Sequence, residues 1–325
     1  MAVDMAKGAV PGNRSGTDSA ESRLDLALRH LRSLSTGDLG ALEAVAIGLP
    51  AIPPLRDLLF QREPSGLFQP RCQAVFALAA LGAHDVLKDF LNTDNDISDP
   101  VERAGEDAVI NAVARVMAKF CSEPVFLRLL YLASSRKLAG PIEAIGATRR
   151  PEALPCLIAA LENDLARPVA EIALRNFGRE ASTALTGGAC AVSPRDGDES
   201  DSSRRRRRSA LRLLSEIRNP MGTDDAVRSG WRSDPDTQIA LLGCCLALDL
   251  GDEAERRSAV QQLVRMLGEV RRNFRSDIIE ALVRYAPYSW PQIKEISSAA
   301  TPSHEDEFAS TEIQRDLQQL KHRLR

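Results

Sequence analysis

Apolar residues recur along most of the chain at spacings of three and four, which is the period of an amphipathic helix. The first series of such residues consists of Leu24, Leu28, Leu31 and Leu34. The tripeptide Thr36-Gly37-Asp38 interrupts the pattern, and Leu39 begins a second series. The order of helix, short turn and helix then recurs to the end of the chain. The sequence therefore predicts an all-helical protein built from helical hairpins.

An internal repeat supports this interpretation. Residues 51–59 read Ala-Ile-Pro-Pro-Leu-Arg-Asp-Leu-Leu, and residues 153–161 read Ala-Leu-Pro-Cys-Leu-Ile-Ala-Ala-Leu. The two segments are 102 residues apart, which is three periods of about 34 residues, a length typical of helical repeats. A shorter pair, residues 138–142 and 165–169, shares the pattern Leu-Ala-x-Pro-branched.

Proline and glycine mark the expected helix ends. Proline is tolerated in the first turn of a helix, because its missing N–H would have no partner there. Glycine closes helices because it readily takes the left-handed conformation. We expect this role for Gly82, Gly146, Gly178 and Gly251.

Two segments resemble bacterial HEAT repeats of the phycobilin-lyase type. The first joins residues 48–55 to residues 71–82, and the second runs from Pro151 to Gly178. The resemblance implies an α-solenoid of degenerate helical hairpins, in which the second helix of each hairpin lines a concave face. It implies no single activity, since solenoids of this kind include scaffolds, adaptors and some enzymes.

The pattern divides the chain into four parts. We expect a disordered leader at residues 1–21, the solenoid at 22–296, a linker at 297–310 and a capping helix at 311–325. The final helix begins with the capping box Thr311-Glu312-Ile313-Gln314, and its apolar stripe could cap the solenoid or pair with another chain. A polar insertion at residues 191–203 is expected to lie outside the core, so that its deletion changes stability by less than about 1 kcal/mol.

Charge and cysteine content narrow the classes of function. The net charge is −3, which gives no support for general binding to nucleic acid or anionic membranes. The sequence shows neither a secretory signal nor an apolar run long enough to span a membrane. Six cysteines without a C-x-x-C pair indicate a reducing compartment, so we expect a cytoplasmic protein.

Five consecutive arginines are the most unusual local feature: Arg204, Arg205, Arg206, Arg207 and Arg208. Acidic residues precede them, which favours a solvated, locally neutralised face. Alternatively, the run binds an anion such as phosphate, nucleic acid or an acidic protein segment. In both cases the arginines are surface charges, and replacing them with serine is expected to leave the melting temperature nearly unchanged.

Polar residues on expected second helices are candidates for contact with a partner. They are Arg103, Arg115, Glu143, Glu171 and Arg175. The alternative is an ordinary surface face with pairs four residues apart.

The sequence contains few candidates for catalytic residues. The four histidines are far apart in sequence, and no metalloprotease, nucleophile-elbow, phosphate-loop or dinucleotide motif is present. We therefore expect no cofactor, no metal and no enzymatic activity. The expected function is a scaffold or adaptor whose concave face binds a protein or peptide. The alternatives are polyanion binding through residues 204–208 and a HEAT-like enzyme of the lyase or DNA-glycosylase type.

Overall fold

The structure is a computed structural model that describes residues 15–62, 64–93, 97–191, 194–195, 198–218, 234–269 and 272–284, with Arg315, Gln318 and His322. These residues are almost entirely helical. The exception is a pair of two-residue antiparallel strands, β1 (Pro194–Arg195) and β2 (Asp198–Glu199). The prediction of an all-α protein is confirmed. The predicted linker, and all but three residues of the predicted capping helix, lie outside the described residues.

The chain divides into two compact units, one ending at Leu129 and the other beginning at Leu130. The first unit contains α1 (Ser15–Arg32), α2 (Gly37–Ile47), α3 (Ile52–Phe60), α4 (Gln69–Ala80), α5 (His84–Asn92) and α6 (Pro100–Met117). The helix α7 (Glu123–Ser135) spans the boundary. In this unit α2 packs on α4 and α4 on α6, while α3 packs on α5, so alternate helices form two layers.

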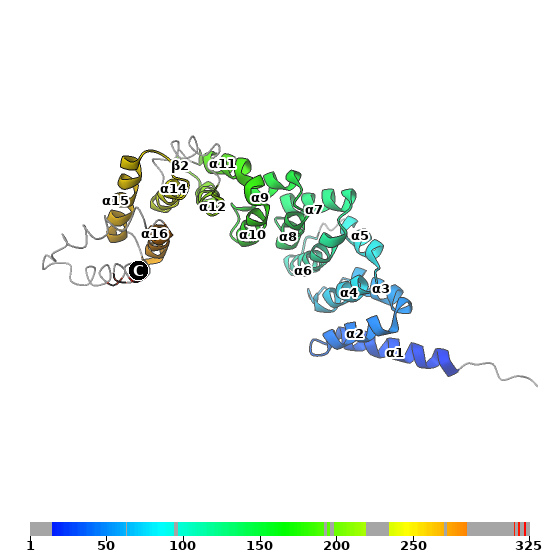
Figure 1. Cartoon of the computed structure of the whole chain (residues 1–325). Coiled ribbons are helices and arrows are strands. Elements are labelled where there is room, and N and C mark those ends of the chain that lie inside the picture. The colour runs from blue at the N-terminus through cyan, green and yellow to red at the C-terminus, as the bar shows by residue number, and fades with distance from the viewer. Residues whose placement is uncertain are drawn as a thin grey trace, which may run out of the picture. The chain divides into compact units, whose positions relative to one another are not determined.

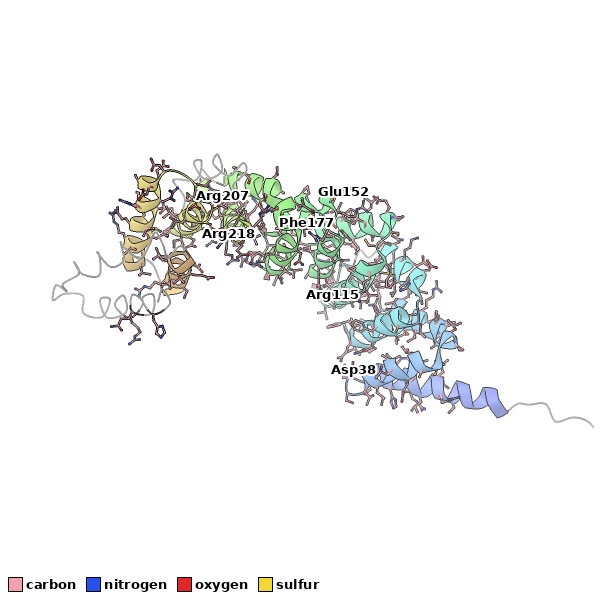
Figure 2. All side chains as sticks on the ribbon, viewed as in Figure 1. Asp38, Arg115, Glu152, Phe177, Arg207 and Arg218 are labelled. Atoms are coloured by element: carbon pink, nitrogen blue, oxygen red, sulfur yellow. The ribbon has the colours of Figure 1, made fainter. Side chains whose placement is uncertain are left out.

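The second unit contains α8 (Ala139–Thr148), α9 (Leu154–Ala160), α10 (Arg167–Phe177), α11 (Ser182–Cys190), α12 (Asp201–Ile217), α14 (Pro235–Ala247), α15 (Glu253–Glu269) and α16 (Arg272–Arg284). The helices α8, α10, α12, α14 and α16 pack in that order, and α9 packs on α11 in the other layer (Figure 1). Phe177, which is almost completely buried, lies in the core between the layers (Figure 2).

Helix starts follow the expected chemistry. In each of the two segments related by 102 residues, a short 3-10 turn leads into a helix with proline in its first turn. Asp99 caps α6 by accepting from the backbone N–H groups of Val101 and Glu102, at 2.9 and 2.8 Å. Asp234 caps α14 in the same way, and Pro235 follows it in the first turn. The proline pattern therefore extends further along the chain than the repeat comparison indicated.

The glycine predictions are right at two positions and wrong at two. Gly82 and Gly178 have φ angles of 75° and 59° and lie at the ends of α4 and α10. Gly251 has a φ angle of 81° but lies beyond the end of α14, where Asp249 takes the left-handed conformation with a φ angle of 51°. Gly146 instead lies inside α8, where a Cβ atom would overlap the Cβ of Ala173 on α10. Gly146 thus allows two helices to approach closely.

The first helix begins earlier than its apolar pattern. α1 starts at Ser15, inside the segment predicted as a disordered leader, and Leu34 lies beyond its end with 63% of its surface exposed. Ala27 and Leu31 carry the buried face that packs on α2.

Candidate binding groove

A groove of about 580 Å³ runs over four helices of the second unit, α10, α12, α14 and α16. These helices belong to the same layer, so each contributes its outward face. The charged residues that line it are Arg167, Glu171, Arg175, Arg205, Arg208, Arg212, Glu216, Asp236, Asp277 and Glu280. Pro168, Ile239, Ala240, Gly243 and Ala281 add apolar surface.

Glu171 is the central polar residue on the α10 side. It is only 7% exposed, and both of its carboxylate oxygens are occupied. The Ser209 hydroxyl donates to Oε1 at 2.7 Å, and the Arg212 guanidinium donates to Oε2 at 2.6 Å. Because a buried carboxylate is costly unless it is paired, these bonds fix α12 against α10.

Arg175 extends this network along the groove. Its Nε donates to Glu216 at 2.6 Å, and its Nη2 lies 3.8 Å from Glu171. The hydrogen bond to Glu216 raises the pKa of Arg175, so the guanidinium remains charged. The side chain is nevertheless 40% exposed, which leaves part of the guanidinium open to the groove.

The opposite side of the groove is acidic. Asp236 is paired with Arg208; burial raises the pKa of Asp236, and Arg208 opposes that shift. Asp277 makes no hydrogen bond or ion pair within the described part of the chain. Although its side chain borders solvent, desolvation by the groove wall raises its pKa, while Arg212 and Arg208 act in the other direction.

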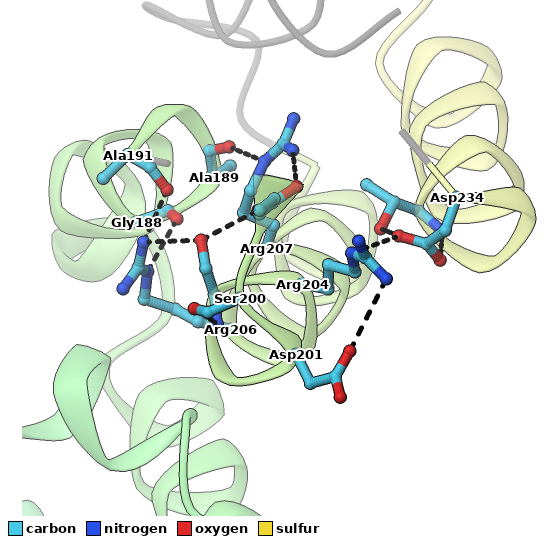
Figure 3. A network of polar contacts seen from close by, with 12 residues as sticks. Gly188, Ala189, Ala191, Ser200, Asp201, Arg204, Arg206, Arg207 and Asp234 are labelled. Carbon is cyan, nitrogen blue, oxygen red and sulfur yellow. Dashed lines mark hydrogen bonds and ion pairs between the residues drawn. The ribbon is translucent and has the colours of Figure 1, made fainter. Parts of the chain in front are cut away.

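The arginine run separates into different roles, and two of its members are buried (Figure 3). Arg206 is 7% exposed and donates to the carbonyls of Gly188 and Ala191 and to Glu162. Arg207 is 3% exposed; it donates to the Ala189 carbonyl at 2.9 Å and to Glu199 at 2.7 Å.

These carbonyls are the unpaired acceptors at the C-terminal end of α11, where the helix dipole favours positive charge. Arg206 and Arg207 therefore cap α11 from α12. The prediction that all five arginines are surface charges is wrong for these two, because their partners come from a neighbouring helix that a charge run does not reveal.

The other three arginines are partly exposed, and each meets a carboxylate. Arg204 points away from Arg206 and Arg207 toward Asp201 and Asp234 (Figure 3). Arg205 lies 3.6 Å from Asp164, and Arg208 pairs with Asp236. Of the run, only Arg205 and Arg208 line the groove.

The candidate residues on second helices fall in different places. Glu171 and Arg175 line the groove. Arg103 belongs to the first unit, where its guanidinium donates to the Ile97 carbonyl at 2.8 and 2.6 Å and so holds the start of α6. Arg115 on α6 and Glu143 on α8 are exposed and are not part of the groove.

Sequence reasoning missed six charged groove residues: Arg167, Arg212, Glu216, Asp236, Asp277 and Glu280. A signal for the α12 members was present. Arg205, Arg208, Arg212 and Glu216 follow one another at spacings of three and four, which places them on one helix face. The acidic residues on α14 and α16 carried no comparable pattern.

Part of the predicted insertion belongs to the packed structure. α12 begins at Asp201, its N-cap Ser200 accepts from the Ser203 N–H at 3.2 Å, and Ser203 is fully buried. The Glu199 carboxylate accepts hydrogen bonds from the Ser203 hydroxyl and from the Arg207 guanidinium. Residues 199–203 are therefore part of the packed structure, although the whole segment 191–203 was expected to lie outside the core.

Comparisons with known proteins identify no family. No family model matches the chain, and no curated protein matches it. Within the described ranges, no helix is long and apolar enough to cross a bilayer, and no three His, Cys, Asp or Glu residues are grouped as metal ligands.

Proposed function

We propose that this protein is a helical-repeat scaffold that binds a protein segment in the groove over α10, α12, α14 and α16. The observation that carries the proposal is the groove itself, whose volume of about 580 Å³ lies in the range of about 300–1,000 Å³ typical of ligand sites. Sites for small molecules are mostly apolar, whereas ten charged side chains line this one. Such a lining favours a polar polypeptide.

Within the all-α class, we propose that the fold is an α-solenoid of degenerate HEAT-type helical hairpins. The repeated Ala-branched-Pro-x-Leu motif supports it, as does the packing of alternate helices within each unit. A solenoid has a larger radius of gyration than the roughly 20 Å expected for a compact domain of this length. Small-angle scattering measures this directly, and a value at or below the compact one would exclude a solenoid.

The proposed location is the cytoplasm. All six cysteines are free thiols, and burial raises the pKa of Cys72 to about 11 and also raises that of Cys156. Thiols with raised pKa values are poor nucleophiles, so these residues act as small apolar side chains.

Polyanion binding through residues 204–208 is the less favoured function. Every arginine of the run is paired with a carboxylate, and two are buried. A polyanion would have to displace these intramolecular partners.

A random short-peptide library displayed on phage tests the proposed function. The wild-type protein should enrich a set of peptides, and Ala240→Phe should abolish that enrichment, because a phenyl group at this position occupies the groove. The matched control is Ala254→Phe on the exposed surface of α15, outside the groove. Equal enrichment by the wild type and Ala240→Phe would refute the groove as the binding site.

A further inference from the structure

The charges in the groove are separated between its two walls. The α10–α12 wall is formed by α10 and α12 and carries five arginines and two glutamates. The α14–α16 wall is formed by α14 and α16, and its described charged residues are Asp236, Asp277 and Glu280. One wall therefore has a net positive charge and the other a net negative charge.

The basic wall retains donors for a ligand. Arg212 is 51% exposed and Arg175 is 40% exposed, although each is fixed by a carboxylate from within the protein. A guanidinium has five N–H donors, so the single close bond from Arg212 to Glu171 leaves others directed elsewhere. These preoriented guanidinium groups suit a second carboxylate supplied by a partner.

The acidic wall retains an acceptor. Asp277 makes no hydrogen bond or ion pair within the described residues, although Arg212 and Arg208 are near enough to influence it. A carboxylate without a partner inside the protein can form a charge-assisted hydrogen bond with a cation supplied by a ligand. A lysine or arginine side chain from a bound segment would supply this partner.

Resting on the proposed function, we infer that the groove selects a protein segment that carries acidic and basic residues on opposite sides. The acidic side chains of the segment bind Arg175 and Arg212, and its basic side chains bind Asp277. Two small residues of α14, Ala240 and Gly243, line the groove beside the acidic residues and allow the segment to approach this wall closely. The opposite polarity of the walls fixes the orientation of the segment, since reversing it would place like charges together.

The test uses the phage-displayed library with two neutralising variants of the full chain. The first, Arg175→Gln with Arg212→Gln, neutralises the basic wall. The second, Asp277→Asn with Glu280→Gln, neutralises the acidic wall. The control, Arg257→Gln with Glu253→Gln, neutralises an exposed ion pair on α15 that lies outside the groove.

Peptides enriched by the wild type and the control should contain both Asp or Glu and Lys or Arg. The basic-wall variant should lose enrichment of the acidic residues alone, and the acidic-wall variant should lose enrichment of the basic residues alone. A synthetic peptide from the wild-type selection should bind each wall variant about tenfold more weakly, the effect of losing one charged hydrogen bond.

Peptides of a single charge sign, or the same composition with both wall variants, would overturn the inference while leaving the groove as a binding site. The proposed function fails separately, if Ala240→Phe leaves enrichment unchanged. Circular dichroism of each variant must match the wild type. If the basic-wall variant is unfolded because Arg212 supports Glu171, Arg175→Gln alone tests the same wall.

Discussion

At the scale of single residues, the arginine run shows how one sequence pattern can contain opposite roles. Arg206 and Arg207 each lie four residues before a buried apolar residue, Ala210 and Leu211 respectively, so the period of α12 places them on its inner face. The prediction that the whole run consists of surface charges overlooks this spacing. What the sequence could not supply was their partners. The carbonyls of α11 and the carboxylate of Glu162 reach them only through tertiary packing.

Replacing Arg207 with methionine is expected to lower the free energy of unfolding by about 3–5 kcal/mol, because it leaves Glu199 and the Ala189 carbonyl without their buried donor. The control is Arg204→Met, which removes a partly exposed arginine from the same helix and should cost less than about 1 kcal/mol. Urea denaturation of both variants measures the difference. Equal losses would show that Arg207 is not a structural cap.

Asp277 should destabilise the fold at neutral pH. Its pKa is raised in the folded state, so ionisation is less favourable there than in the unfolded chain, and stability falls as the pH rises through the titration range. Asp277→Asn removes the ionisable group and is expected to raise the free energy of unfolding at neutral pH by less than about 1 kcal/mol, since the side chain borders solvent.

This gain should disappear below about pH 3, where the aspartate is protonated in both states. Urea denaturation at neutral and acidic pH measures it. A gain that is independent of pH would mean that ionisation of Asp277 is not its cause.

At the scale of secondary-structure elements, most helices could be predicted because leucine spacing and first-turn prolines both report local structure. Two differences have physical reasons. α1 begins in the polar segment 15–21, which has no apolar period to mark it. Gly146 ends an apolar run, as a helix-closing glycine would, but the close approach of Ala173 can be recognised only in three dimensions.

The segment 191–203 gives a test at this scale. Its deletion removes Glu199, the N-cap Ser200 and the first turn of α12. We expect the free energy of unfolding to fall by about 3 kcal/mol or more, because buried Arg207 loses its carboxylate and α12 loses its cap. Chemical denaturation of the deletion variant, with Ser200→Ala as a variant that loses the cap alone, separates the two contributions. A loss below 1 kcal/mol would restore the interpretation of this segment as a loop outside the core.

At the scale of the whole molecule, the order of packing determines how far a local change spreads. In the second unit each helix packs mainly on helices close to it in sequence, as in repeat proteins, where stability is a sum of local and nearest-neighbour terms. The candidate groove was less predictable than this order, because Glu171, Arg208 and Asp277 come from three helices whose alignment no sequence pattern encodes.

Hydrogen exchange tests whether the chain behaves in this local way. Arg207→Met loosens the junction of α11 and α12, so amide exchange should accelerate in these helices and in their neighbours α9, α10 and α14. Exchange in α2 and α4 of the first unit should stay at the wild-type rate, because those helices do not share the lost contacts. Mass spectrometry of peptides from the wild type, Arg207→Met and the Arg204→Met control resolves the helices separately. Equal acceleration in α4 and α12 would show that the chain unfolds as one cooperative unit, in which loss of packing at the α11–α12 junction lowers the stability of every helix.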